Sequence, residues 1–255
     1  MYYFASDIHL GAGDEHSARA VERRFVAWLD KVSGDAEAIF LVGDIFDFWF
    51  EYRRVVPKGF VRTLGKLAEL TDRGVRVVFF TGNHDMWVGD YLARECGLEI
   101  HTAPQVMTLS GKKVFIAHGD NMKIDGQPML KFLNRIFRSR TLKWLFSWGV
   151  HPDLAMKFGH WWSGKSRKRH NAADEEAVRT GRGGGFDASL TEPLIDYARQ
   201  YAATHDIDHF VFGHMHFPRD YREGRLHVVN LGCWAGNPSY AVLDAAGEMT
   251  LKMLG

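Results

Sequence analysis

Two things are scarce in this sequence of 255 residues: cysteine and long apolar runs. The two cysteines, Cys96 and Cys233, lie far apart and outside any C-x-x-C motif, so we interpret both as reduced thiols in or near the core. No uninterrupted apolar stretch reaches the ~18–20 residues that a membrane-spanning helix needs. The N-terminus also lacks the pattern of a signal peptide. The sequence therefore predicts a cytosolic protein with at most a peripheral membrane contact.

An excess of charge of one sign is absent as well. Lysine and arginine number 32 against 31 aspartates and glutamates, which gives a net charge of +1. No global field therefore favours nucleic acid or a membrane surface, and any such argument must be local. Hydrophobic residues at 46% and charged residues at 25% are ordinary for a folded globular protein. The length allows one large domain or two small ones.

What is present is an alternation of strand and helix patterns. The first three strands alternate with two amphipathic helices, which implies parallel strands with helical crossovers. Two later apolar runs joined across residues 110–112 predict a β-hairpin, so the sheet is not purely parallel. Helices are predicted over about 16–31, 58–73 and 190–201. Strands are predicted at the N-terminus, at 38–42, 75–80, 105–109, 113–117, 226–230, 239–243 and 249–253, and directly before Gly213.

Residues 121–170 interrupt this alternation. Three apolar sets rich in tryptophan, phenylalanine and leucine are interspersed with eleven basic residues and only two acidic ones. We interpret 121–189 as a helical cap insertion with a glycine-rich return linker, and 1–120 and 190–255 as the core. Three roles compete for the insertion: a self-packed appendage, a nucleic-acid surface, or a cap that encloses acyl chains and meets anionic headgroups. The density of large aliphatic and aromatic residues favours the lipid-binding cap.

The most informative pattern is repeated at five strand ends. In each case an apolar run ends in Gly or Ser beside Asp, Asn or His, which are side chains that bind metals. Open α/β sheets place their ligands at the carboxyl ends of strands. Each motif alone is explained by an ordinary loop or turn, but five in sequence predict a metal centre at what could be one edge of a sheet. The segments are Tyr2–His9, Ala38–Asp47, Val77–Asp85, Val114–Asp120 and Phe210–His216.

The number of donor groups indicates two ions. In an extended strand, side chains alternate with a period of two, so Asp-x-His and His-x-His are each expected to place both ligands on one side. Seven donors exceed the needs of one ion and suit two ions ~3.5–4 Å apart that share a carboxylate, for which Asp44 is the natural bridge. Imidazole, carboxylate and amide groups without thiolate favour Mn²⁺ or Fe²⁺. The predicted ligands are Asp7, His9, Asp44, Asn83, His118, His214 and His216. Asp47 and Asp120 are expected to orient them.

These blocks resemble those of a known family. Ser-Asp-x-His, Gly-Asp-x-x-Asp, Gly-Asn-His-Asp, His-Gly-Asp and Gly-His-x-His are similar to the five signature blocks of the calcineurin-like metallophosphoesterases. The resemblance covers most of the chain outside 121–190. It implies an α/β fold, a four-layer αββα sandwich of mixed sheets with an inserted helical cap, and a di-manganese site. One ion would be held by Asp7, His9, Asp44 and His216, and the other by Asp44, Asn83, His118 and His214.

Within that superfamily, the first two blocks and the basic insertion after His118 look like the UDP-2,3-diacylglucosamine hydrolases of lipid A biosynthesis. This resemblance implies hydrolysis of a lipid-linked nucleotide sugar to UMP and 2,3-diacylglucosamine 1-phosphate at the cytoplasmic face of the inner membrane. Peripheral contact would be made through the cap, and nucleic acid is not expected as a partner. That branch has arginine at the position of His84. This chain has histidine there, like the broader superfamily. Two Mn²⁺ ions are expected, with Fe²⁺ or Mg²⁺ as alternatives.

Catalytic and substrate roles follow from the same blocks. His84 is expected to donate to the transition-state oxygens or to protonate the leaving group, with Asp85 holding its tautomer. Two other hypotheses stay open: a phosphodiesterase or phosphatase for another nucleotide or lipid phosphate, and a catalytically silent scaffold of the same fold. The residues predicted to bind substrate are Asn83, His84, Asp125, Ser163, Lys165, Ser166, Arg167 and His214.

Overall fold

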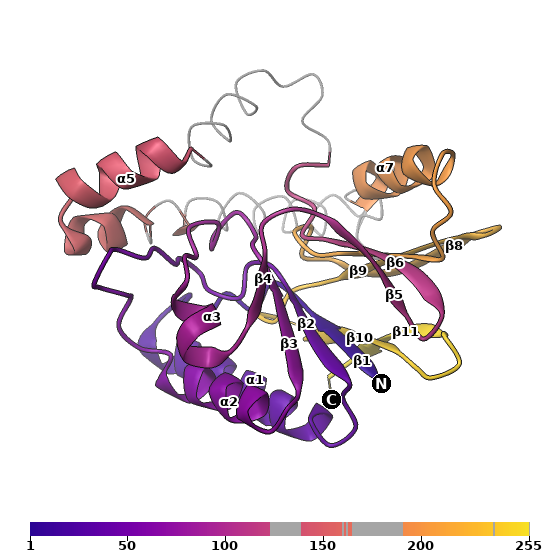
Figure 1. Ribbon diagram of the computed structural model, residues 1–255, viewed down its shortest axis with the longest axis horizontal. Coiled ribbons are helices and arrows are strands. Elements are labelled where there is room, and N and C mark those ends of the chain that lie inside the picture. The colour runs from indigo at the N-terminus through magenta and orange to yellow at the C-terminus, as the bar shows by residue number, and fades with distance from the viewer. Residues whose placement is uncertain (123–138, 160, 162, 165–190, 237, 255) are drawn as a thin grey trace, which may run out of the picture.

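The structure is a computed structural model of the chain. The structure describes all residues except 123–138, 160, 162, 165–190, 237 and 255. Two β-sheets lie face to face in it, with helices on their outer faces (Figure 1). In the part that is described, no helix is both long enough and apolar enough to cross a membrane.

The first sheet has six strands in the order β11-β10-β1-β2-β3-β4. The pairings β1–β2 and β2–β3 are parallel, as the strand–helix alternation predicts, and so is the edge pairing β3–β4. The pairings β1–β10 and β10–β11 are antiparallel. The central strand β2 is buried on both faces along its whole length, which explains its unbroken apolar sequence. The strands are β1 (Tyr2–Ala5), β2 (Ala38–Val42), β3 (Arg76–Phe80), β4 (Glu99–His101), β10 (Ser239–Leu243) and β11 (Met249–Met253).

The second sheet has five strands in the order β5-β6-β7-β9-β8. The predicted hairpin is confirmed as the antiparallel pair β5–β6, whereas β6–β7 and β7–β9 are parallel. Both sheets are therefore mixed. The strands are β5 (Gln105–Leu109), β6 (Lys112–Ala117), β7 (His209–Phe212), β8 (Pro218–Glu223) and β9 (Leu226–Leu231).

Alternate residues of the strands build three apolar layers. In β2, Phe40 points into the core between the sheets, while Ile39 and Leu41 pack against the helices outside the first sheet. Phe210 of the second sheet packs in the same way against α7. The four-layer αββα sandwich is thus confirmed. Helices α1 (Glu15–Val32), α2 (Val61–Asp72) and α3 (Tyr91–Cys96) cover the first sheet, α7 (Glu192–Ala202) covers the second, and α5 (Arg140–Gly149) lies in the insertion.

The sequence pattern missed three short elements. Strand β8 has largely exposed, charged residues, and its sheet-edge position explains why no apolar alternation marks it. Helix α3 and strand β4 have only 6 and 3 residues, too few to show a period. The remaining predicted core helices and strands are confirmed with small shifts at their ends. Of the predicted insertion, the described residues are 121–122, 139–159, 161, 163 and 164.

Candidate metal centre

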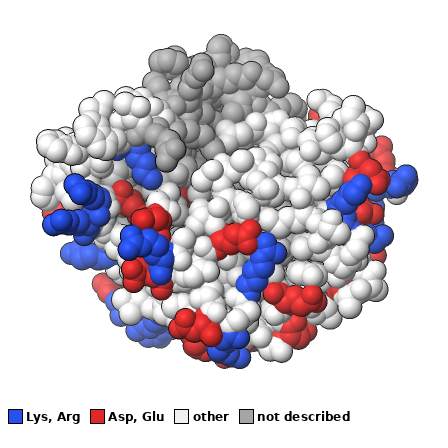
Figure 2. All heavy atoms as spheres, viewed as in Figure 1, with Lys and Arg blue, Asp and Glu red and all other residues white. Residues whose placement is uncertain are grey.

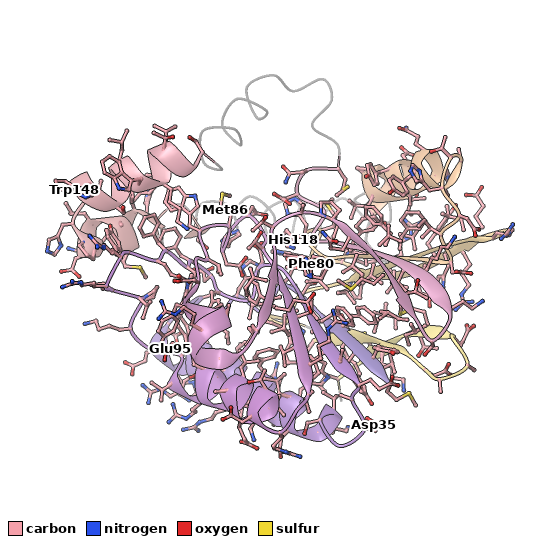
Figure 3. All side chains as sticks on the ribbon, viewed as in Figure 1. Asp35, Phe80, Met86, Glu95, His118 and Trp148 are labelled. Atoms are coloured by element: carbon pink, nitrogen blue, oxygen red, sulfur yellow. The ribbon has the colours of Figure 1, made fainter. Side chains whose placement is uncertain are left out.

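The five predicted loops meet at one end of the sandwich, but they come from both sheets. Asp7, Asp44 and Asn83 follow β1, β2 and β3 of the first sheet, while His118 and His214 follow β6 and β7 of the second. The centre therefore lies between the ends of two facing sheets, which corrects the expectation of a single sheet edge. Figure 3 shows His118 at this end, above Phe80.

The parallel pairing of β1 and β2 continues into the loops that carry the ligands. The backbone N–H of Asp7 donates to Gly43 O at 3.1 Å, and that of His9 donates to Asp44 O at 3.0 Å. These bonds hold the first two blocks in register past the last residue of each strand. The side chains of Asp7 and Asp44 are consequently placed by the sheet itself rather than by free loops.

Left-handed backbone is concentrated at this centre. Five predicted ligands have φ between 50° and 70°, a region that non-glycine residues rarely adopt. The expectation that Asp-x-His and His-x-His are extended is therefore wrong, because the strands end before these motifs begin. Strained backbone of this kind persists where the surrounding structure holds it, and it is common at functional sites. The five residues are Asp7, His9, Asp44, His214 and His216.

Two glycines allow the loops to approach each other. A Cβ at Gly82 would lie 2.1 Å from Asp44 Oδ1, and a Cβ at Gly213 would lie 2.6 Å from Asp7 Oδ2. Any larger residue at either position would displace a carboxylate. These close approaches explain why both blocks place glycine directly before the ligand-bearing residue.

One donor group forms around Asp44. Its carboxylate, His118 and His214 each offer an atom within 4.8 Å of the others. His118 Nδ1 lies 2.9 Å from Val42 O, so that nitrogen carries the proton and Nε2 is directed at Asp44 Oδ2, 3.2 Å away, and at Asn83 Oδ1, 3.3 Å away. A backbone carbonyl on the far nitrogen is the usual support of a metal-binding histidine.

A second donor group forms around His9. Its Nε2 lies 3.0 Å from His216 Nε2, and His216 Nε2 lies 3.2 Å from Asp7 Oδ1. Ligand atoms of Asp44, His9 and His84 also lie within 4.8 Å of one another, so the Asp44 carboxylate belongs to both clusters. This is the position expected of a bridging ligand. All seven predicted ligands therefore converge.

Charge and hydrogen bonding in the centre fit divalent cations. Asp7 and Asp44 are essentially buried, and among the described residues no lysine or arginine forms an ion pair with either. Asp7 Oδ1 is buried without a hydrogen-bond partner. Burial lowers the pKa of His9 to about 3, and burial and the His118 charge lower that of His214 to about 4, so both rings are neutral donors. Buried carboxylates beside the neutral rings of His9 and His214 need a positive partner.

His118 differs from those two rings. Burial lowers its pKa, but the charge and hydrogen bond of Asp44 outweigh burial and leave the pKa well above the ordinary value. In the metal-free protein a proton on His118 thus supplies part of the positive charge that Asp44 requires. A cation shared by both side chains would take over that role.

His84 is oriented by a residue other than the one predicted. Its Nδ1 lies 2.9 Å from the backbone oxygen of Asp47, so this carbonyl sets the tautomer and leaves Nε2 towards the centre, 3.9 Å from Asp44 Oδ2. Asp85 instead accepts backbone N–H groups of Gly82 at 2.7 Å and Ile45 at 2.8 Å. The predicted tautomer role of Asp85 is wrong, and Asp85 ties two ligand loops together.

Asp47 also links the centre to the insertion. Its carboxylate accepts the hydroxyl of Ser163, and it lies 3.7 Å from His9 Nδ1. Ser163 is therefore buried and bonded to Asp47, and its predicted contact with substrate stays a prediction. Of the other predicted substrate contacts, Asp125, Lys165, Ser166 and Arg167 lie outside the described residues.

An apolar pocket opens beside His84. Aromatic residues of the core loops form one wall, and residues 158–159 of the insertion form another. The insertion thus brings apolar surface directly to the polar centre. The pocket is lined by Phe48, Trp49, Asn83, His84, Met86, Trp87, Phe158, Gly159 and Ser163.

Sequence analysis missed a fourth kind of donor, a thiol. Cys233 follows the carboxyl end of β9. Its sulfur and ring nitrogens of His9 and His216 lie within 4.8 Å of one another. The cysteine is not in a disulfide and is only partly buried. The available signal was Gly232-Cys233 directly after a predicted strand, a sixth repeat of the strand-end pattern that was interpreted as a core thiol.

Comparison with known proteins places this geometry in a family. The sequence pattern described as calcineurin-like phosphoesterase matches residues 2–218. A UDP-2,3-diacylglucosamine hydrolase of Porphyromonas gingivalis is 39% identical over 250 residues, covering 95% of this chain and 93% of that protein. Proteins of the same name from Histophilus somni and Haemophilus ducreyi are 25% and 28% identical, and the alignments cover 96% and 91% of this chain and 97% and 91% of theirs.

The matched pattern spans all five ligand-bearing loops, and the two facing mixed sheets carry those loops to one buried cluster of carboxylates and imidazoles. Sequence and geometry therefore agree, and this chain belongs to the calcineurin-like phosphoesterase family.

Proposed function

We propose that this protein hydrolyses the pyrophosphate bond of UDP-2,3-diacylglucosamine, giving UMP and 2,3-diacylglucosamine 1-phosphate. The observation that carries the proposal is the apolar pocket that opens beside His84 and the buried donor cluster. A diacylated nucleotide sugar has matching parts, because its apolar acyl chains lie next to a charged diphosphate. The relatives that share up to 39% identity with this chain carry the name of that activity.

Two divalent cations would be held by the converged ligands, and Mn²⁺ is the proposed metal. Asp7, His9, Asp44 and His216 would hold one ion, and Asp44, Asn83, His118 and His214 the other. Carboxylate, amide and imidazole groups are typical ligands of Mn²⁺, with Fe²⁺ or Mg²⁺ as alternatives. When bound, such a pair lowers the pKa of water and offsets negative charge on the phosphoryl oxygens.

His84 has the position of a proton donor. Its Nδ1 is held by the Asp47 carbonyl, so Nε2 is the atom that can bring a proton to the departing oxygen. The ring packs edge-on against His9, with centroids 4.8 Å apart, and is almost fully buried. This packing restricts the imidazole to one orientation beside the predicted ligands.

The insertion would serve as a lipid-binding cap. Phe146 of α5 packs on Phe50 and Trp87 of the core, with ring centroids 5.2 and 5.3 Å apart, and Lys143 donates to Trp87 O at 2.9 Å. The outer face of α5 exposes Trp144 and Trp148, at 58% and 80%. Trp148 lies far from the labelled residues of the core in Figure 3.

Those exposed rings support a peripheral contact with a membrane, because aromatic side chains are favoured at the interface between headgroups and acyl chains. Charged residues of both signs are interspersed over the lower part of the face seen in Figure 2. That part of the surface therefore offers no broad field of one sign, and we assign the membrane contact to α5.

Product analysis with UDP-2,3-diacylglucosamine tests the function. The metal-free protein is reloaded with Mn²⁺ and incubated with substrate in detergent, and UMP and the lipid phosphate are expected in equal amounts. Hydrolysis of bis-p-nitrophenyl phosphate without cleavage of the lipid substrate would keep the phosphoesterase chemistry and reject this substrate. Failure to cleave either compound with bound metal would indicate a silent scaffold.

A further inference from the structure

Cys233 is placed beside the donor cluster by the second sheet. Strand β9 runs parallel to β7, so its carboxyl end lies next to the one that supplies His214 and His216. The segment after β9 is fixed to the first sheet by the backbone N–H of Trp234, which donates to Asp7 O at 3.1 Å. Cys233 is thus held by its neighbours on both sides and does not lie on a free loop.

Trp234 supports this placement from the core. Its indole is fully buried and packs edge-on against Phe25 and Trp28 of α1, with centroids 5.4 and 5.5 Å apart. Gly232 turns the chain with φ of +77°, and a Cβ there would lie 2.6 Å from Ser239 Oγ. The position of the thiol therefore follows from packing that has nothing to do with a metal.

The thiol lies beside side chains of the predicted ligand set that already face each other. Its sulfur and ring nitrogens of His9 and His216 are all within 4.8 Å of one another. Ligand atoms of one zinc ion lie up to about 4.4 Å apart, the sum of a sulfur bond and a nitrogen bond, which is slightly less than the 4.8 Å span of this group. The buried Asp7 Oδ1, without a hydrogen-bond partner, lies 3.2 Å from His216 Nε2 in the same cluster.

We propose that Cys233 is an additional, thiolate ligand of the cation held by Asp7, His9, Asp44 and His216. This inference rests on the proposed metal centre and refines it. A soft thiolate favours Zn²⁺, Co²⁺ or Fe²⁺ over Mn²⁺. The other ion, held by Asp44, Asn83, His118 and His214, has no sulfur in its described group. The two sites of one centre therefore differ in metal preference.

Cobalt spectroscopy of the full-length protein tests the proposal directly. Metal-free protein loaded with Co²⁺ is expected to show a near-ultraviolet charge-transfer band from thiolate to cobalt, besides the visible bands of the ion. Cys233→Ser should lose the charge-transfer band and keep the visible bands. Cys96→Ser is the matched control, because the only other cysteine is buried beside α2, 3.7 Å from Leu64 O, and should leave the band unchanged.

Zinc affinity supplies a second measurement. Cys233→Ser should bind Zn²⁺ at least about tenfold more weakly, since losing even an outer partner of a metal ligand costs ~10–100-fold. The affinity for Mn²⁺ should change less. Equal losses for both metals would overturn the proposal, because they would indicate general damage and no selective sulfur ligand.

The wild-type protein provides a test that does not depend on a variant's folding. Alkylation of Cys233 by iodoacetamide should slow when the protein is loaded with Zn²⁺, and an unchanged rate would contradict a sulfur–metal bond. Bound cobalt without a charge-transfer band would overturn this inference alone. A protein that binds no cobalt at all would overturn the proposed metal centre as well.

Discussion

Two histidine clusters lie at opposite ends of the second sheet, and only one of them has the character of a metal centre. At the carboxyl ends of the strands, His9 and His216 face each other at 3.0 Å with carboxylates converging beside them. At the other end, His209 Nδ1 lies 2.8 Å from His227 Nδ1, but Asp220, the carboxylate paired with His227, lies at the far nitrogen of that ring. Asp220 therefore cannot share an ion with the two facing Nδ1 atoms.

The backbone conformation distinguishes the two clusters as clearly as the hydrogen bonds do. His209 and His227 belong to regular strands β7 and β9, and His209 Nε2 faces Gly247 O at 3.0 Å. His9 and His216 have left-handed φ of 50° and 55° and lie beyond their strands. Close imidazoles alone therefore do not identify a ligand set. Convergent carboxylates on a constrained backbone do.

The contrast between the two histidine clusters depends most on Asp44, which we expect both ions to share. Asp44→Asn should lower kcat/KM at least about 10³-fold, more than the ~10²–10³-fold cost of losing one donor to the transition state. Metal analysis should find fewer than two ions per chain. His227→Asn is the control from the other cluster, and it should keep both ions and near-normal activity. Full metal content in Asp44→Asn would contradict its place in the centre.

His84 should affect chemistry without affecting metal content. His84→Ala is expected to lower kcat by about 10²–10⁴-fold, the usual contribution of a general acid or base. Its Nδ1 is held by the Asp47 carbonyl and it is proposed as the proton donor, so we assign it no ion. Metal content measured alongside kcat separates the roles, and loss of an ion would make His84 a ligand. His101→Ala is the control, since that ring pairs with Glu99 outside the centre.

The second cluster should matter for stability alone. His227→Phe leaves His209 Nδ1 without its partner in a buried site. Such a loss costs about 1–3 kcal/mol. Urea denaturation should show this decrease in the free energy of unfolding, with metal content and kcat unchanged. A metal-dependent rise in the stability of the wild type that vanishes in His227→Phe would mean that this cluster also binds an ion.

The smallest effect is expected where the cap meets the core. Phe146→Ala removes two aromatic ring pairs, each worth ~0.5–1.5 kcal/mol, so KM for the lipid substrate should rise roughly 2- to 12-fold for each pair. Hydrolysis of bis-p-nitrophenyl phosphate should hardly change. Trp148→Ala on the exposed face of α5 should weaken binding to vesicles and leave KM in detergent unchanged. The reverse pattern would place the substrate pocket outside the cap.

Much of the fold could be predicted because apolar periods are local. Strand β2 was predicted with the bounds that it has, since a strand buried on both faces has no polar interruption. Strand β8 was missed because an edge strand is under no such constraint. Residues 123–138 and 165–190, where the sequence predicts most of the cap and linker, lie outside the described residues.

By itself the sequence determined which seven candidate ligands follow the strand ends, because five strand ends carry donors and parallel strands bring their carboxyl ends together. Only the tertiary structure decided how they converge. Two sheets had to face each other before His118 could reach Asp44, and left-handed backbone at Asp7 and His9 depends on packing from outside the motif. Cys233 became a neighbour of His9 for the same reason, because β9 is set beside β7 by interactions that no local pattern records.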